Sequence, residues 1–162
     1  MDNLFFNEEH TMLVNMVRDF ANTEIAPITR EMDEKCEIPK EIIAQMAELG
    51  LMGIPVPGEY GGAGMDTVAY AAAVMELAKV DASVAITMAA HTSLGTLPIV
   101  IAGTEEQKQA YLPKLASGAV IGAFGLTEPE AGSDAGSTKT SAELDGDEYV
   151  VNGGKIFITN SG

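Results

Sequence analysis

The chain has 162 residues and a formal net charge of −15, because 24 acidic residues outnumber 9 basic ones. So few basic residues cannot neutralise a run of phosphates, which argues against nucleic-acid binding and against electrostatic docking on an anionic membrane. Hydrophobic residues make up 46% of the chain, enough for a packed core, so global disorder is excluded.

The single cysteine, Cys36, forms no intrachain disulfide and suits a reducing compartment. The N-terminal residues are acidic, with neither a basic start nor a long apolar stretch, so no signal peptide is predicted. We therefore expect a cytoplasmic bacterial protein or an already processed organellar one.

The first two-thirds of the chain has the periodicity of helices. Apolar residues in 8–22 recur at the helical spacing and predict one amphipathic helix. A second helix is predicted over 39–49, with Pro39 at its start and Gly50 at its end. Residues 53–65 are rich in glycine and proline and are predicted to form a loop.

Three further helices complete this part. Asp66 caps a predicted helix that runs to about Val80, and Thr104 opens a capping box for a helix to about Ala116. Between them, residues 82–102 are apolar almost all round and long enough to span a membrane. The stretch also carries a histidine and several hydroxyl residues and lacks a positive flank. A buried helix of an all-helical domain therefore explains it better.

After residue 118 the apolar pattern changes to a period of two, which predicts strands. The four predicted strands are Val120–Thr127, Thr138–Leu144, Glu148–Val151 and Ile156–Thr159. The dipeptides Asp145-Gly146 and Asn152-Gly153 fall between the last three and predict hairpin turns, because both tolerate positive φ.

The two patterns together predict the fold class and the division of the chain. The class is α+β, with an all-α N-terminal domain over residues 1–116. The first strands of an incomplete antiparallel β-domain follow over residues 117–162. The glycine-rich loop 58–64 does not satisfy the dinucleotide pattern G-x-G-x-x-G, because position 67 is threonine. The two histidines lack metal-ligand spacing, so no metal site is predicted.

The most informative segment is 124–134, Phe-Gly-Leu-Thr-Glu-Pro-Glu-Ala-Gly-Ser-Asp. It leaves the end of an apolar predicted strand and enters a polar loop. Backbone N–H groups at a strand end can bond the edge of a flat heterocycle, and a Gly-Ser turn can present amides and a hydroxyl to a phosphate. A polar hairpin loop without a ligand is the alternative that these residues leave open.

Five separated segments resemble the acyl-CoA dehydrogenase family, most closely its short-chain, butyryl-CoA type. The segments are 47–53, 59–62, 103–108, 124–134 and 155–160, and they match in order over essentially the whole chain. The pattern Thr-Glu-Pro-x-Ala-Gly-Ser-Asp in the fourth is highly specific. The resemblance implies a helical N-terminal domain, a middle β-barrel domain that begins near residue 117, and a C-terminal four-helix domain. It also implies oxidation of acyl-CoA thioesters to trans-2-enoyl-CoA with FAD as cofactor.

The resemblance also assigns roles to residues. Seven positions match FAD-binding ones: Phe124, Leu126, Thr127, Gly132, Ser133, Phe157 and Thr159. The first three match positions that line the flavin ring. Gly132 and Ser133 match positions near the FAD pyrophosphate and the CoA entrance. Phe157 matches an aromatic position packed on the flavin, and Thr159 matches a position near the flavin N5 region. Ser133 is thereby also a predicted substrate contact.

Further substrate contacts are predicted on the helix over 82–102. Thr87, Ala90, His91 and Leu94 have the spacing of one helical face, and the resemblance places this helix beside the acyl chain. Ordinary core packing is an equal alternative, and a lone histidine on an apolar helix is more often a satisfied core residue. The family's catalytic glutamate belongs to a C-terminal motif that no residue here matches, so we assign no catalytic residue.

Two functions from different classes follow. The chain is expected to be the N-terminal portion of a FAD-dependent acyl-CoA dehydrogenase, and these residues alone are expected to be inactive. The family further implies an electron-transferring flavoprotein as partner and a homotetramer. The alternative is a truncated, non-catalytic homologue that serves only in packing or association.

Overall fold

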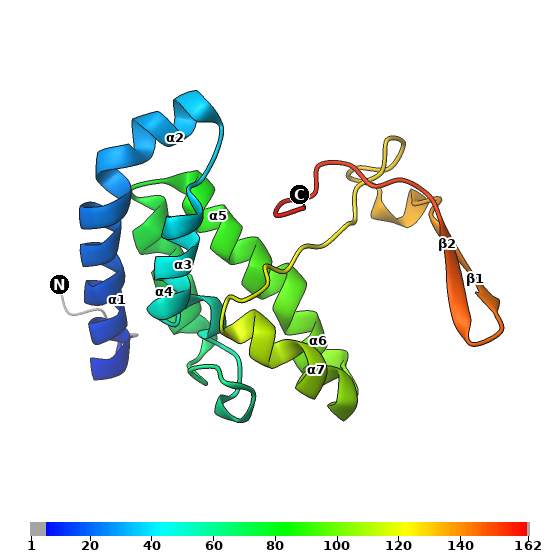
Figure 1. The fold of residues 1–162 in the computed structure, drawn as a ribbon, viewed down its shortest axis with the longest axis horizontal. Coiled ribbons are helices and arrows are strands. Elements are labelled where there is room, and N and C mark those ends of the chain that lie inside the picture. Colours follow the sequence, from blue (N-terminus) through cyan, green and yellow to red (C-terminus); the bar gives the residue numbers. More distant parts are fainter. Residues whose placement is uncertain (1–5, 162) are drawn as a thin grey trace. The chain divides into compact units, whose positions relative to one another are not determined.

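The computed structural model describes residues 6–161, which form two compact units (Figure 1). The first, here called the helical unit, ends at Gly122, and the second, the hairpin unit, begins at Ala123. The predicted domain boundary after residue 116 lies six residues before this division and stays a prediction. The α-helices are α1 Glu8–Phe20, α2 Thr29–Lys35, α3 Lys40–Glu48, α4 Thr67–Ala78, α5 Ala82–Ala90, α6 Leu97–Ala102 and α7 Glu105–Ala116.

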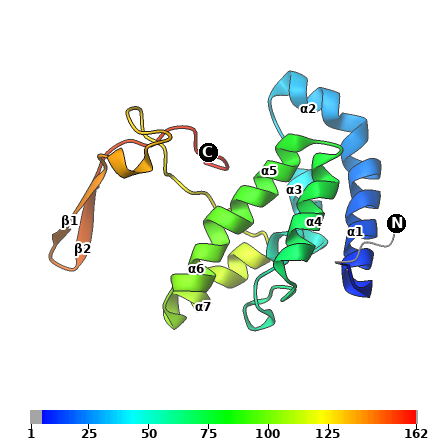
Figure 2. The same ribbon diagram turned by 180° about the vertical axis from the view of Figure 1, so that it is seen from behind.

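Within the helical unit, α1 packs on α4, and α4 packs on α5, so that these three lie side by side in both views (Figures 1 and 2). Helix α6 packs on α7. The main core contains fully buried side chains from several elements, including Val17, Ile25, Met46, Leu51, Met52, Leu77, Val84 and Met88. A smaller cluster joins the loop before α4 to α7, through Val56, Tyr60, Leu112 and Ala116.

The predicted helix starts are confirmed by their capping contacts. The Asp66 carboxylate accepts a hydrogen bond from the Ala69 N–H at 2.9 Å at the start of α4. Thr104 and Gln107 cap each other's backbone N–H groups at the start of α7, as the predicted capping box requires. Such caps satisfy N–H groups that have no partner inside the helix.

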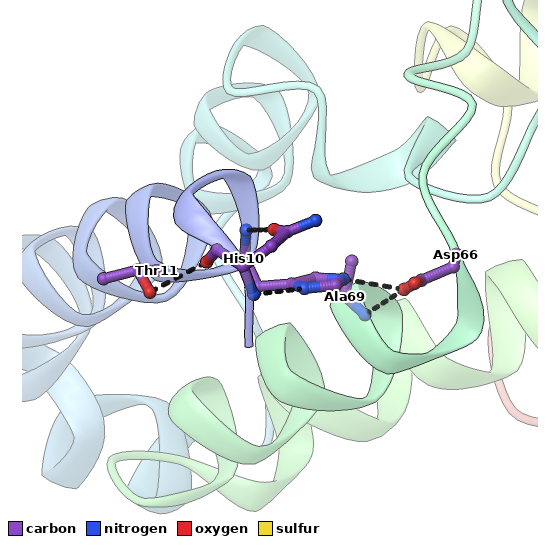
Figure 3. Close-up of polar contacts among 5 residues, drawn as sticks. His10, Thr11, Asp66 and Ala69 are labelled. Atoms are coloured by element: carbon purple, nitrogen blue, oxygen red, sulfur yellow. Dashed lines mark hydrogen bonds and ion pairs between the residues drawn. The ribbon is translucent and has the colours of Figure 1, made fainter. Parts of the chain in front are cut away.

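His10 connects the first turns of two helices that are far apart in sequence (Figure 3). Its Nδ1 accepts a hydrogen bond from the Asn7 N–H at 3.2 Å, so the ring proton is on Nε2. The Nε2 lies 2.9 Å from Asp66 Oδ1 and donates to it. The Ala69 N–H and, after it, His10 lower the pKa of Asp66 below its usual value. One imidazole therefore bonds the caps of both α1 and α4.

The Asp66→Ala substitution should lower the melting temperature of the chain by about 4 °C, because it removes both the α4 cap and the acceptor of His10. Asp66→Asn is the matched control, since it keeps an oxygen at the cap and should lose less. Thermal unfolding followed by far-UV circular dichroism measures both. Equal melting temperatures for the wild type and Asp66→Ala would contradict the assigned double role.

The hairpin unit contains two antiparallel strands, β1 Ser141–Asp145 and β2 Glu148–Asn152. Asp145 pairs with Glu148, so the turn consists of Gly146 and Asp147, with Gly146 at a φ of 63°. The hairpin predicted from Asp145-Gly146 is confirmed. All strand residues are exposed, so both faces of this ribbon are open to solvent.

Two of the four predicted strands are wrong. Residues 120–127 and 156–159 form no strand with any other described residue, although one hydrogen bond runs from the Ile156 N–H to the Thr127 carbonyl. The hairpin predicted at Asn152-Gly153 is absent from the described residues for the same reason. An apolar period of two reports extended backbone, but a strand also needs a hydrogen-bonded neighbour, which the pattern does not reveal.

The helical predictions need two corrections. Helix α2 was not predicted, because its seven residues include a single buried apolar side chain, Met32, and so show no apolar face that recurs. The helix over 82–102 is continuous but contains a π-helical turn, His91–Thr96, between α5 and α6. The predicted class, a helical domain followed by the start of an antiparallel β-domain, is confirmed.

Among the described residues, Ala82–Ala102 is the one helix long and apolar enough to cross a membrane. Core helices of soluble proteins pass the same test of length and composition. Here 39% of its most apolar window is buried inside the protein, and Val84, Ala85 and Met88 belong to the main core. The prediction of a buried helix therefore holds for α5, whereas α6 contains no buried residue.

Candidate functional site

His91, on the helix over 82–102, is a polar residue that is 0% exposed, as are Thr92 and Thr96. Its Nδ1 accepts a hydrogen bond from the Gly122 N–H at 2.9 Å. The proton is therefore on Nε2, which donates to the Met52 carbonyl at 3.2 Å. Burial lowers the pKa of His91 below its ordinary value of 6.5, which keeps the ring neutral. His91 thus joins three segments of the helical unit through their main chain.

The four residues predicted to face the acyl chain do not share one environment. Ala90 and His91 are buried, Thr87 is half-buried, and Leu94 is 46% exposed. Their predicted common face assumed α-helical spacing throughout, whereas the π-helical turn begins at His91 and changes the phase of Leu94. For His91, with both ring nitrogens bonded to the main chain, the geometry supports the core alternative that the sequence left open.

In the hairpin unit, the segment 124–127 presents apolar side chains to solvent. Phe124 and Leu126 are each 44% exposed and, two residues apart on extended backbone, lie on the same side of the chain. Thr127 is half-buried, and its carbonyl accepts the hydrogen bond from Ile156 at 2.9 Å. That bond brings the segment next to Phe157, although the sequence separates them by about thirty positions.

The other predicted FAD-binding residues lie on exposed backbone. Phe157 is 88% exposed and has a φ of 56°, a conformation that bulky residues rarely adopt. Thr159 is exposed, and so are Gly132 and Ser133 in the loop before the hairpin. A Cβ on Gly132 would meet nothing within 4 Å, so this loop offers open space at the position matched to the pyrophosphate.

Glu128 accepts hydrogen bonds from several segments of this region, and no role was predicted for it from the sequence. It is 6% exposed, and its carboxylate accepts hydrogen bonds from Lys155 Nζ at 2.7 Å, the Lys139 N–H at 2.6 Å and the Thr140 N–H at 3.1 Å. Lys155 Nζ also donates to the Leu126 carbonyl at 3.0 Å. The sequence shows an acidic residue within the family-specific motif, which could have pointed to Glu128. Its hydrogen-bond partners, however, lie 11 to 27 residues further along the chain, so the motif alone does not reveal them.

Lys155 is the largest cause of the low pKa of this carboxyl group. Together with the hydrogen bonds from Thr140 and Lys139, it lowers the pKa of Glu128 from 4.5 to about 2. A depressed folded-state pKa means that the ionised carboxylate stabilises the fold above pH 4.5, and that this contribution is lost as the pH falls toward 2.

An NMR titration should therefore show the Glu128 carboxyl changing its charge near pH 2, together with shifts of the Lys139 and Thr140 amides. In the Lys155→Met variant the midpoint should move upward, because the ammonium partner is gone. A wild-type midpoint at pH 4 or above would contradict the buried ion pair.

Among the described residues, no group of three or more histidine, cysteine or acidic side chains is placed to hold a metal ion. Comparison with protein families gives two matches that follow each other along the chain. The acyl-CoA dehydrogenase N-terminal domain matches residues 7–119, and the acyl-CoA dehydrogenase middle domain matches residues 123–162.

The chain belongs to the acyl-CoA dehydrogenase family. Among its relatives is an acyl-CoA dehydrogenase of Bacillus subtilis, 52% identical over 155 residues, which are 96% of this chain and 41% of the relative. The short-chain specific acyl-CoA dehydrogenase of Clostridium acetobutylicum is 52% identical over 154 residues, 95% of this chain and 41% of that protein. This chain thus spans less than half the length of the relatives it matches.

Solved structures agree with the family assignment. The butyryl-CoA dehydrogenase of Megasphaera elsdenii has a TM-score of 0.91 at 41% identity, over 96% of this chain and 42% of that one. An acyl-CoA dehydrogenase from Bacillus anthracis, complexed with FAD, has a TM-score of 0.85 at 41% identity, over 97% of this chain and 27% of that one. A structure described for the electron transferring flavoprotein of Acidaminococcus fermentans has a TM-score of 0.92 at 46% identity, over 96% of this chain and 41% of that one.

Proposed function

We propose that this chain is the N-terminal portion of a FAD-dependent enzyme that oxidises acyl-CoA thioesters to trans-2-enoyl-CoA. The observation that carries the proposal is the match of both units, in order, to the N-terminal and middle domains of the acyl-CoA dehydrogenase family. The relatives named for short-chain and butyryl-CoA substrates favour short acyl chains for this protein as well.

The residues of the hairpin unit fit a flavin. Phe124, Leu126 and Phe157 expose apolar surface that a flat ring can cover, and such coverage would remove this surface from water. Phe157 keeps an unusual backbone conformation at the same place, and strained backbone of this kind clusters at ligand sites. The FAD complex of the Bacillus anthracis relative adds support from a protein 41% identical to this chain.

Each group on this chain then has a task. Phe124 and Leu126 would pack on the flavin, and Thr127 and Thr159 would offer hydroxyl groups to its polar edges. Gly132 and Ser133 would allow the close approach of phosphate oxygens. FAD, when bound, supplies the acceptor for the hydride that leaves the acyl β-carbon. Thr87, Ser133 and Leu94 would contact the acyl-CoA, while Ala90 and His91 fix the helix from its buried side.

The direct test uses the protein encoded by the complete reading frame that contains residues 1–162. After purification, its flavin content is measured by absorbance, and dye reduction is measured with butyryl-CoA. We expect bound FAD and reduction that depends on the acyl-CoA. Residues 1–162 alone serve as the control and should fall short by a factor of roughly 10²–10⁴, because no catalytic base is assigned within them. A protein without flavin and without turnover would favour the packing module instead.

Thr127→Val should weaken FAD binding by a factor of roughly 2–10, because it removes one hydroxyl bond to a buried heteroatom while keeping the side-chain shape. Thr138→Val is the matched control, since Thr138 is also half-buried in the hairpin unit but has no assigned flavin contact. Both dissociation constants are measured on the apoprotein by flavin fluorescence. If the two variants bind FAD equally well, the assignment of Thr127 is wrong.

Partner and location are further parts of the proposal. An electron-transferring flavoprotein is the partner that the family implies, and a structure described for such a flavoprotein is among the similar ones. A homotetramer and a cytoplasmic location stay predictions, which size measurement and cell fractionation of the complete protein would test.

A further inference from the structure

We infer that Glu128 is a positioning residue for the flavin, because its carboxylate fixes three stretches of the hairpin unit that carry or adjoin the residues assigned to FAD. This inference rests on the proposed function. It concerns a residue that contacts none of the reacting atoms and acts through the backbone of its neighbours.

The first stretch is the turn that contains Glu128 itself. The Glu128 N–H donates to the Ala131 carbonyl at 3.0 Å, and the Ala131 N–H donates to the Glu128 carbonyl at 3.1 Å. These reciprocal bonds close the turn directly after Thr127 and directly before Gly132. The conformation of the turn therefore determines the backbone direction at both Thr127 and Gly132.

The second stretch is the entry to β1. Two successive backbone amides, those of Lys139 and Thr140, donate to the two different oxygens of the Glu128 carboxylate. The loop from Gly132 to Thr138 is consequently held at both ends by one residue, through its main chain at Ala131 and through its side chain at Lys139 and Thr140. Ser133, assigned to the pyrophosphate and the CoA entrance, lies within that loop.

The third stretch begins at Lys155. Its ammonium group donates both to the Glu128 carboxylate and to the Leu126 carbonyl, and the next residue, Ile156, donates its N–H to Thr127. Leu126 and Thr127 are thereby connected to the two residues that precede Phe157. The exposed rings of Phe124 and Phe157 sit on backbone that these bonds hold together.

A carboxylate suits this place better than any similar side chain. All three of its partners are donors, and an ionised carboxylate offers only acceptors on both oxygens. Glutamine has the same shape but turns one oxygen into an N–H₂ group, which would face a donor instead of accepting from it. Glu128→Gln therefore removes the acceptor at one of the two oxygens while changing the side-chain volume very little.

A suitable control is available two residues away. Glu130 is exposed, and its carboxylate pairs with the Lys139 ammonium group. Glu130→Gln removes the same charge from the same turn without touching the backbone amides. A difference between the two variants then reports the geometry of Glu128 and not the loss of one negative charge.

The experiment measures the FAD dissociation constant, the flavin absorption spectrum and the melting temperature of the apoprotein from the complete reading frame. We expect Glu128→Gln to weaken FAD binding by about tenfold or more, as the loss of charge-assisted hydrogen bonds implies, and to shift the flavin absorption maximum. Glu130→Gln should stay within about twofold of the wild type, a bound set by exposed ion pairs. Glu128→Asp, which keeps the charge, should restore part of the affinity.

The outcomes separate the inference from the proposed function. A wild-type protein that binds no FAD overturns both. A wild type that binds FAD, with Glu128→Gln equal to it in affinity and spectrum, overturns the inference alone, and so does a lowered melting temperature with unchanged FAD binding. If Glu128→Gln does not fold, Lys155→Met replaces it, because it leaves the amide bonds of the carboxylate in place and should still weaken FAD binding.

Discussion

The His91→Phe substitution should lower the free energy of unfolding by about 2–4 kcal/mol, since each buried polar group that loses its partner costs about 1–3 kcal/mol. Phenylalanine fills a similar volume, so the effect comes from hydrogen bonding and not from a cavity. The change removes the acceptor of the Gly122 N–H and the donor to the Met52 carbonyl, both inside the helical unit.

Urea unfolding followed by far-UV circular dichroism measures this effect, because the helical unit supplies the helical signal. Leu94→Ala, on the neighbouring turn, is the control: Leu94 is 46% exposed, so its truncation should change stability much less. Equal unfolding midpoints for His91→Phe and the wild type would show that the buried bonds carry no net stability.

Gly62→Ala should lower the free energy of unfolding by about 3 kcal/mol or prevent the loop before α4 from forming, because overpacking forces the backbone to move. A Cβ at Gly62 would lie 2.1 Å from the Val56 carbonyl oxygen and 2.4 Å from the Val56 Cβ. The first is a main-chain atom of a fully buried residue, so it cannot turn aside as a flexible side chain would.

Gly58→Ala tests the specificity of this effect within the same loop. A Cβ at Gly58 meets nothing within 4 Å, and its φ is not positive, so the substitution should be nearly neutral. The two variants are compared by thermal unfolding in the same buffer. Similar losses in both would mean that the contact with Val56 is not the cause.

The sequence predicted best where the signal is local. Asp66 and Thr104 cap their own helices within three residues, so a short stretch of sequence contains the whole interaction. Strands depend on partners elsewhere in the chain. Residues 120–127 have the right alternation, but no other described residue pairs with them as a strand. Helix α2 was not predicted because seven residues with one buried apolar side chain, Met32, are too few for the helical period to show.

The candidate site was predictable only in part, for the same reason. Its motif residues were assigned through the family resemblance, because spacing alone does not say which ligand a strand end and a Gly-Ser turn would bind. Glu128 stands inside the motif, but its importance depends on Lys139, Thr140 and Lys155, which the chain brings back from elsewhere. For His91 the sequence left both a pocket role and a core role open, because the choice depends on its bonds to the Met52 carbonyl and the Gly122 amide.

The bond between His10 and Asp66 also bears on how the helical unit opens. Helix ends normally fray independently, since their first amides are held only by local contacts. Here the first turns of α1 and α4 share one imidazole, although 56 positions separate the two residues. Fraying at the start of α1 removes the imidazole that holds the capping carboxylate of Asp66, and fraying at the start of α4 removes the acceptor that holds His10. Exchange of the amide hydrogens in the two turns should therefore be coupled.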